Sequence, residues 1–126
     1  MSEKQVANGR YTWELRYRHL RGDEGLSVRL LGPVENQTRE LARFDCFKES
    51  PHYHTAVYDH NTIRPIEESD PVAWFLNHVR RDLAGLVASS GGDAPTEQES
   101  QNHANAVSSV ASHSKKLIAE ATAAAS

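Results

Sequence analysis

Cysteine is nearly absent from this sequence, and its scarcity excludes two kinds of chemistry. Cys46 is the only cysteine among 126 residues, so no internal disulfide can form and we expect a reducing compartment. The paired-cysteine spacing of structural zinc sites is also missing. The sequence has no glycine-rich phosphate loop and no nucleophile elbow, so it lacks these signatures of nucleotide binding and of serine hydrolases.

Long hydrophobic runs and a strong excess of one charge are missing too. No apolar stretch approaches membrane-spanning length, and the first residues show no signal-peptide pattern, so we expect a cytoplasmic protein that does not bind a membrane. The formal net charge is −3 and the isoelectric point is about 6.1. Such a chain has no overall field that attracts nucleic acid, which is therefore not expected as a partner.

The composition that remains is typical of one small domain with a tail. It divides the chain into a flexible N-terminus (residues 1–10), an α+β domain (11–88), a polar linker (89–102) and an alanine-rich tail helix (103–126). A core of this size buries a modest fraction of the chain's surface, so a partner or a second copy could add to its stability.

Alternation of apolar and polar residues predicts an antiparallel sheet. The clearest strand places Trp13 and Leu15 on one face and Glu14 and Arg16 on the other. The expected strands are residues 11–19, 26–31, 38–47, 52–58 and 62–66. Pro65 cannot donate to a neighbouring strand and so indicates a sheet edge. The expected fold class is α+β, with a meander of four or five strands.

A helix is expected after the strands, because Asp70 can cap it and Pro71 suits its first position. Apolar residues then recur at three- and four-residue spacing and form one stripe: Val72, Phe75, Leu76, Val79, Leu83 and Leu86. We expect this stripe to pack on the aromatic face of the first hairpin, where Trp13 and Trp74 would face each other.

The C-terminal region is expected to be a tether followed by a helix. Residues 89–102 are too polar to offset the cost of ordering. A narrow seam of small and apolar residues follows: Ala104, Val107, Ala111, Ser114, Ile118, Ala121 and Ala125. Such a helix either frays in solvent or docks, and we expect residues 103–125 to become ordered on a protein partner or on another copy of the chain.

Candidate chemistry is concentrated between Arg43 and His60. His52 and His54 are two residues apart in a predicted strand, so they project from the same face and could bind a divalent metal, the one cofactor considered. Asp45 and Cys46 could approach from the neighbouring strand, but they are expected on opposite faces, so at most one of them joins any site. Alternatively, the histidines act as acid and base while Arg43 holds a phosphate, or they are hydrogen-bonded residues of an ordinary sheet face.

Two further features are interpreted as structural. Cys46 lies among phenylalanines, and apolar burial raises a thiol's pKa, so we expect an unreactive side chain. Arg16, Arg18 and Arg29 lie on the polar face of the first hairpin, where Arg43 could extend them into a basic stripe. We expect that stripe to be a solvated sheet face.

The residues from 11 to 87 resemble a small uncharacterised bacterial domain family. The resemblance lies in Arg-Phe-Asp-Cys-Phe at residues 43–47, Pro-His-Tyr-His at 51–54 and a helix that begins Asp-Pro and contains a tryptophan at 70–74. It implies a fold and no known activity. More distantly, the pattern of Arg43, Asp45, His52 and His54 resembles TumE-type toxins, which implies an RNA-directed or partner-neutralised role.

Three functions follow as hypotheses. The first is a non-enzymatic accessory module of a larger assembly or homo-oligomer, with the tail helix as its docking element. The second is a TumE-like toxin or small nuclease-like protein that uses His52 and His54, with Arg43 and Asp45 as further catalytic candidates. The third is a metal-binding domain built on the same two histidines.

Overall fold

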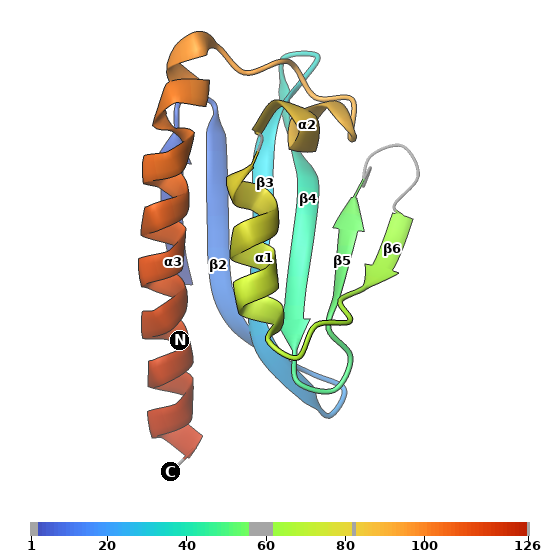
Figure 1. Cartoon of the computed structure of the whole chain (residues 1–126), viewed down its shortest axis with the longest axis vertical. Coiled ribbons are helices and arrows are strands. Elements are labelled where there is room, and N and C mark those ends of the chain that lie inside the picture. The colour runs from blue at the N-terminus through green and yellow to red at the C-terminus, as the bar shows by residue number, and fades with distance from the viewer. Residues whose placement is uncertain (1–2, 56–61, 82, 126) are drawn as a thin grey trace.

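The computed structural model describes residues 3–55, 62–81 and 83–125. Its elements are β1 (Glu3–Asn8), β2 (Tyr11–Leu20), β3 (Asp23–Val34), β4 (Gln37–Phe47), β5 (His52–Thr55), β6 (Thr62–Pro65), α1 (Pro71–Arg80), α2 (Leu83–Ala88) and α3 (Glu97–Ala125). The strands pair in chain order, each antiparallel to the next (Figure 1). The expected α+β meander is confirmed. The end of the strand expected at 52–58 and the turn at 59–61 lie outside the described residues.

The N-terminus is a strand, and its expected flexibility is wrong. β1 pairs with β2 along its whole length and places Val6 opposite Trp13. Its alternation is weak because Val6 is its one large apolar residue. Asn8-Gly9 could have signalled the hairpin, since glycine tolerates the positive φ of 59° that this turn requires. The sheet therefore has six strands rather than four or five.

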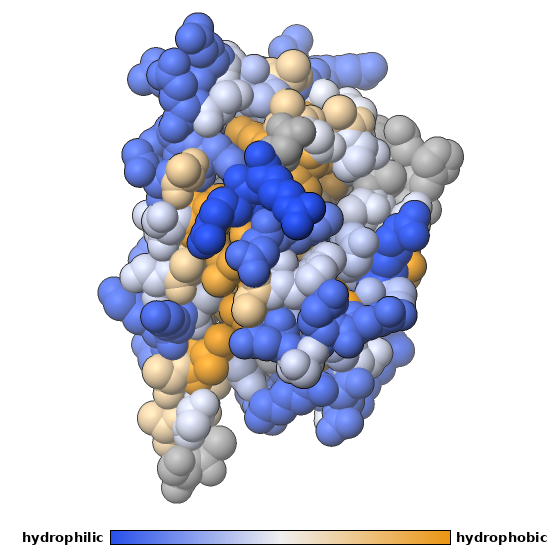
Figure 2. All heavy atoms as spheres, viewed as in Figure 1, coloured by the Kyte–Doolittle hydropathy of each residue, from blue (hydrophilic) through white to orange (hydrophobic). Residues whose placement is uncertain are grey.

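One face of the sheet is apolar and carries all the helices that the structure describes. Trp13, Leu15, Val28 and Phe44 on this face are fully buried. Figure 1 shows α3 lying over β1 and β2 and α1 lying over β3 and β4. From the same side, Figure 2 shows apolar residues along the seam between α3 and α1. The aromatic face of the first hairpin is thus covered mainly by α3, not by the helix expected there.

The helix expected after Asp70 is confirmed at its start and divided further on. The Asp70 side chain accepts a hydrogen bond from the Ala73 amide at 3.1 Å. The predicted apolar stripe continues across α1 and α2, two helices instead of one.

The two tryptophans do not face each other across the core. Phe75 contacts Trp13 edge-on, with 6.3 Å between ring centroids, while Trp74 stacks on His78 at 4.7 Å. Adjacent helix residues point about 100° apart, so Phe75 and Trp74 cannot share one direction. Leu15, Val28, Phe44 and Val79 belong to one buried cluster with Trp13 and Phe75.

The expected polar linker is ordered. Ser90 is fully buried and its hydroxyl donates to the Leu41 carbonyl, and the Asp93 amide donates to the Pro33 carbonyl at 2.8 Å. The later part of the segment begins α3. There Thr96 and Glu99 cap each other reciprocally, with amide-to-side-chain distances of 2.8 and 3.1 Å. This capping box is readable in the sequence and was missed.

The tail helix is docked on its own chain, which corrects the expectation that it needs a partner to become ordered. Its buried seam consists of Ala106, Val107, Val110, Ser114 and Leu117. The seam faces the sheet because β1 and β2 would otherwise expose their apolar side. Neither α3 nor any other described helix combines the length and the apolarity needed to cross a membrane.

Candidate functional site

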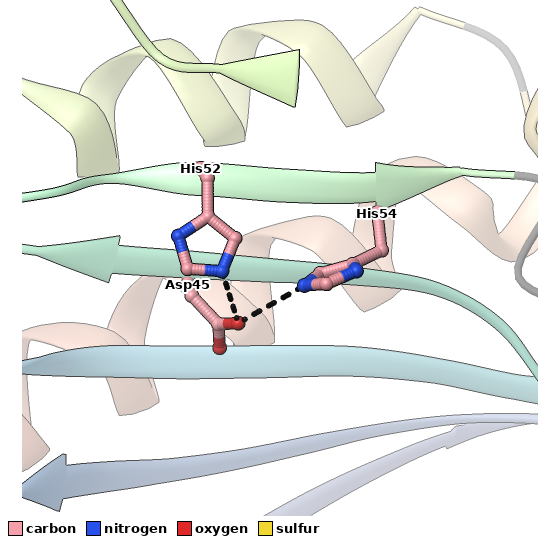
Figure 3. A group of neighbouring side chains, drawn as sticks. All are labelled: Asp45, His52 and His54. Atoms are coloured by element: carbon pink, nitrogen blue, oxygen red, sulfur yellow. Dashed lines mark ion pairs between the residues drawn. The ribbon is translucent and has the colours of Figure 1, made fainter. Parts of the chain in front are cut away.

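The second face of the sheet carries charged side chains and holds the candidate residues. In the strand register, Arg43 lies opposite Arg29 and His54, and Asp45 lies opposite Ser27 and His52. Cross-strand partners project from the same face. The structure therefore brings together all four predicted residues, which we call the open-face site: Arg43, Asp45, His52 and His54. Figure 3 shows both imidazoles directed at the Asp45 carboxylate.

Asp45 forms the centre of the open-face site. Its side chain is only 3% exposed, and its Oδ2 lies 3.2 Å from His52 Nε2 and 3.6 Å from His54 Nε2. Its Oδ1 accepts a hydrogen bond from the Ser27 hydroxyl at 2.6 Å. One ligand atom from each of Asp45, His52 and His54 lies within 4.8 Å of the other two. We call these three residues the ligand triad.

The neighbours of the two imidazoles determine where their protons lie. His52 Nδ1 is 2.9 Å from the Ser50 carbonyl oxygen, which only accepts, so Nδ1 carries the proton and a neutral His52 presents an Nε2 lone pair to Asp45. His54 Nε2 is 3.2 Å from Arg43 Nη2, and a guanidinium only donates. When both histidines are neutral, two nitrogen lone pairs and one carboxylate oxygen therefore converge.

Arg43 borders the ligand triad on its solvent side. Its Nε lies 3.4 Å from Asp45 Oδ2 and its Nη1 lies 3.7 Å from Glu40. The Arg43 Nε atom is buried, and among the described residues it has no hydrogen bond of acceptable geometry. The side chain as a whole is one-third exposed. The guanidinium is thus held beside the carboxylate with donor capacity to spare.

The expected basic stripe is instead a row of alternating charges. Arg29 lies directly opposite Arg43, an unfavourable pairing of like charges. Glu40 offsets it by lying 3.6 Å from Arg29 and 3.7 Å from Arg43. Glu14 also binds Arg29, at 2.6 Å. Burial alone would lower the pKa of Arg29, but hydrogen bonds and charge from Glu14 and Glu40 outweigh the effect of burial, and the pKa is raised.

Cys46 lies on the helix-covered face, so the prediction that Asp45 and Cys46 point in opposite directions is confirmed. The thiol is buried and its sulfur lies 3.7 Å from the Pro71 carbonyl oxygen. Burial, assisted by the charges of Asp45 and Asp70, raises the pKa of Cys46 to about 12. The thiol is protonated at neutral pH, as expected of an unreactive cysteine.

A hollow on the helix-covered side was not anticipated from the sequence. It has a volume of about 310 Å³ and lies where β5 meets α1 and α2, with Tyr53, His78 and Arg81 among its lining residues. Burial and the charge of Arg81 lower the pKa of His78. None of its described lining residues is a carboxylate, so the candidate chemistry lies at the open-face site.

Comparison with known proteins identifies a family without an assigned activity. A family described as a domain of unknown function (DUF7700) matches residues 5–114. The match includes most of β1 and most of α3, both outside the domain expected from composition. No curated protein and no solved structure matches the chain. The resemblance to TumE-type toxins stays a prediction.

Proposed function

We propose that this chain, which belongs to the DUF7700 family of domains of unknown function, binds a divalent metal ion at the open-face site. The metal ligands are Asp45, His52 and His54. The observation that carries the proposal is the convergence of three lone pairs on one point. A carboxylate oxygen and two imidazole nitrogens that lie within 4.8 Å of one another form a donor set that a divalent metal ion can occupy.

Two of the three separations within the ligand triad suit such an ion. Zinc bonds of about 2.0–2.1 Å in a tetrahedral arrangement separate neighbouring ligand atoms by roughly 3.3–3.4 Å. The distances from Asp45 Oδ2 to His52 Nε2 and His54 Nε2 are 3.2 and 3.6 Å. Two imidazoles and one carboxylate are also a donor set that divalent transition metals accept.

Hydrogen bonds behind the ligands support the same assignment. Metal-binding histidines usually donate their second N–H to a carbonyl or carboxylate, and metal-binding carboxylates are themselves hydrogen-bonded. His52 donates to the Ser50 carbonyl, and Asp45 accepts from Ser27. Three protein ligands leave a tetrahedral ion one open position, as in catalytic rather than structural zinc sites.

Metal binding can be tested directly on the untagged, chelator-treated chain. We expect one equivalent of Zn²⁺ to bind, and we expect the melting temperature to rise with Zn²⁺ concentration, since a ligand of the native state stabilises it by about 2.7 kcal/mol at one hundred times its dissociation constant. Asp45→Asn and the double variant His52→Ala/His54→Ala should lose both effects.

A matched control uses a histidine outside the triad. His19 is exposed on β2, where it contacts Tyr17, and His19→Ala should bind zinc as the parent does. Equal zinc binding by the parent and by Asp45→Asn would overturn the proposal, and so would a folded parent that binds no zinc at all.

The other two hypotheses have less support in the geometry. The apolar seam of α3 faces the chain's own sheet, so a partner bound through residues 103–125 would have to contact the polar side of that helix. An acid–base site would use the same open-face residues as the metal site. RNA cleavage that persists after chelation would favour that second function over metal binding.

A further inference from the structure

We infer that Arg43 makes the open-face site a receptor for small oxyanions, carboxylate or phosphate, which would bind the metal at its open position and Arg43 at the same time. This inference rests on the proposed metal site and names the class of ligand that the site accepts. Three properties of the described residues carry it: the charge balance, the uneven exposure of the site and the hydrogen-bonding capacity of Arg43.

The charge balance of the loaded site is positive. A divalent ion adds two charges beside the guanidinium of Arg43, and the nearest carboxylates are those of Asp45 and Glu40. These two offset only two of the three positive charges. Glu14 does not change the balance, because it is paired with Arg29 at 2.6 Å. A partly buried site with an unbalanced positive charge attracts an anion.

Exposure within the open-face site is uneven. Asp45 and His54 are 3% and 7% exposed, whereas His52 and Arg43 are 26% and 33% exposed. His52 and Arg43 are therefore the members of the site that a ligand from solvent can contact most readily, and the guanidinium of Arg43 lies 3.4 Å from Asp45 Oδ2.

Metal binding also changes the partners of Arg43. In the structure its Nη2 faces His54 Nε2 at 3.2 Å and its Nε faces Asp45 Oδ2 at 3.4 Å. Both of those acceptor atoms would coordinate the ion, which leaves the guanidinium fork available. Arginine forks bind carboxylate and phosphate through two parallel hydrogen bonds, and they do so better than lysine.

Two opposed effects of one substitution test the inference on the full-length chain. Co²⁺ replaces Zn²⁺ as a coloured probe, and inorganic phosphate, methyl phosphate and acetate are titrated while the cobalt absorption is followed. For Arg43→Gln we expect Co²⁺ to bind more tightly, because a cation beside Asp45 is removed. We expect anions to bind roughly tenfold to hundredfold more weakly, because charge-assisted hydrogen bonds are lost.

Arg29→Gln is the matched control. Arg29 lies opposite Arg43 on the same face and also approaches Glu40. Among the described residues its ion-pair partners are Glu14 and Glu40 rather than members of the triad, so both affinities should stay within about threefold of the parent. A response to phosphate and methyl phosphate alone would assign the site to phosphoryl groups, and a response to acetate alone to carboxylates.

The outcomes separate this inference from the proposed function. If Co²⁺ binds the parent and no anion changes its spectrum, or if Arg43→Gln binds anions like the parent, the oxyanion inference is overturned while the metal site stands. If the parent binds no Co²⁺, the metal site itself fails and the inference fails with it.

Discussion

The two faces of the sheet bury side chains of opposite chemical character. On the helix-covered face, Trp13, Phe44 and Phe75 are completely buried among apolar neighbours. On the open face, Asp45 and His54 are almost as deeply buried but are surrounded by charges and hydrogen-bonding groups. Apolar burial stabilises a fold by itself, whereas a buried carboxylate costs free energy unless it is compensated.

The difference indicates which face calls for a functional explanation. A buried ion pair is weak evidence for stability, since apolar residues of similar volume often stabilise as well or better. The open-face site therefore contributes little that an apolar face could not, and its chemistry calls for a functional explanation. The helix-covered face needs no such explanation, because its side chains account for the fold.

The largest effect should come from the helix-covered face. Phe75 is fully buried between Trp13 and Phe44, and truncating such a residue costs about 3–5 kcal/mol through lost burial and a cavity. We expect Phe75→Ala to unfold at much lower urea concentration than the parent, and Asn77→Ala, at an exposed position of the same helix, to unfold near the parent's midpoint. Equal midpoints for Phe75→Ala and Asn77→Ala would show that α1 does not pack on the sheet.

A smaller effect is expected where a charge does stabilise the helix-covered layer. The Glu99 side chain caps α3 by accepting a hydrogen bond from the Thr96 amide, and it binds Arg10, with 2.8 Å between Arg10 Nη2 and Glu99 Oε1. Glu99→Ala removes a cap and a charged hydrogen bond, and we expect it to lower the free energy of unfolding by roughly 2–3 kcal/mol. Glu97→Ala, in the same first turn but exposed, is the control for helix propensity.

Lowering the pH should reproduce part of the loss in the free energy of unfolding that is expected in Glu99→Ala. The hydrogen bond from Arg10, followed by backbone amides, lowers the pKa of Glu99 from 4.5 to about 2. Because the folded chain holds this proton less tightly than the unfolded chain, the stabilisation is complete above pH 4.5 and is lost as the pH falls towards 2. Between these pH values the free energy of unfolding, measured with urea, should fall as the pH is lowered, and it should fall less steeply in Glu99→Gln. An unchanged pH dependence in that variant would contradict the assignment of the lowered pKa to Glu99.

The smallest effect is expected from the row of alternating charges. Arg29 binds Glu14 and Glu40 but is about 41% exposed, and exposed ion pairs contribute about 0–1 kcal/mol. Arg29→Gln should therefore change the free energy of unfolding by less than about 1 kcal/mol. A loss as large as that of Phe75→Ala would show that the open face stabilises the fold, and the contrast between the faces would disappear.

The elements in the middle of the chain could be predicted from the sequence, whereas those at its two ends could not. Strands from Tyr11 to Phe47 have strong period-two patterns, and the cap at Asp70 is local, so both could be predicted. β1 and α3 are polar along much of their length. They are stabilised by contacts between residues about ninety positions apart, such as the Asn8 side chain and the Glu99 carbonyl, which no local pattern contains.

The candidate site was predictable in its residues but not in its detail. His52, His54, Asp45 and Arg43 could be grouped because alternation fixes which side of a strand each occupies. Glu40 could not be added, because a register irregularity at Leu30 and Leu31 shifts its position relative to β3. The roles of Ser27 and Ser50 likewise depend on distances that only the folded sheet defines.

The buried thiol of Cys46 provides a built-in reporter on the back of the open-face site. It is the chain's single cysteine, it follows Asp45 in β4, and its sulfur is enclosed against the first turn of α1. A thiol-specific reagent can therefore modify the native protein only when this part of the structure opens. The labelling rate, measured with and without metal, would give the free energy of local opening beneath the site without any engineered probe.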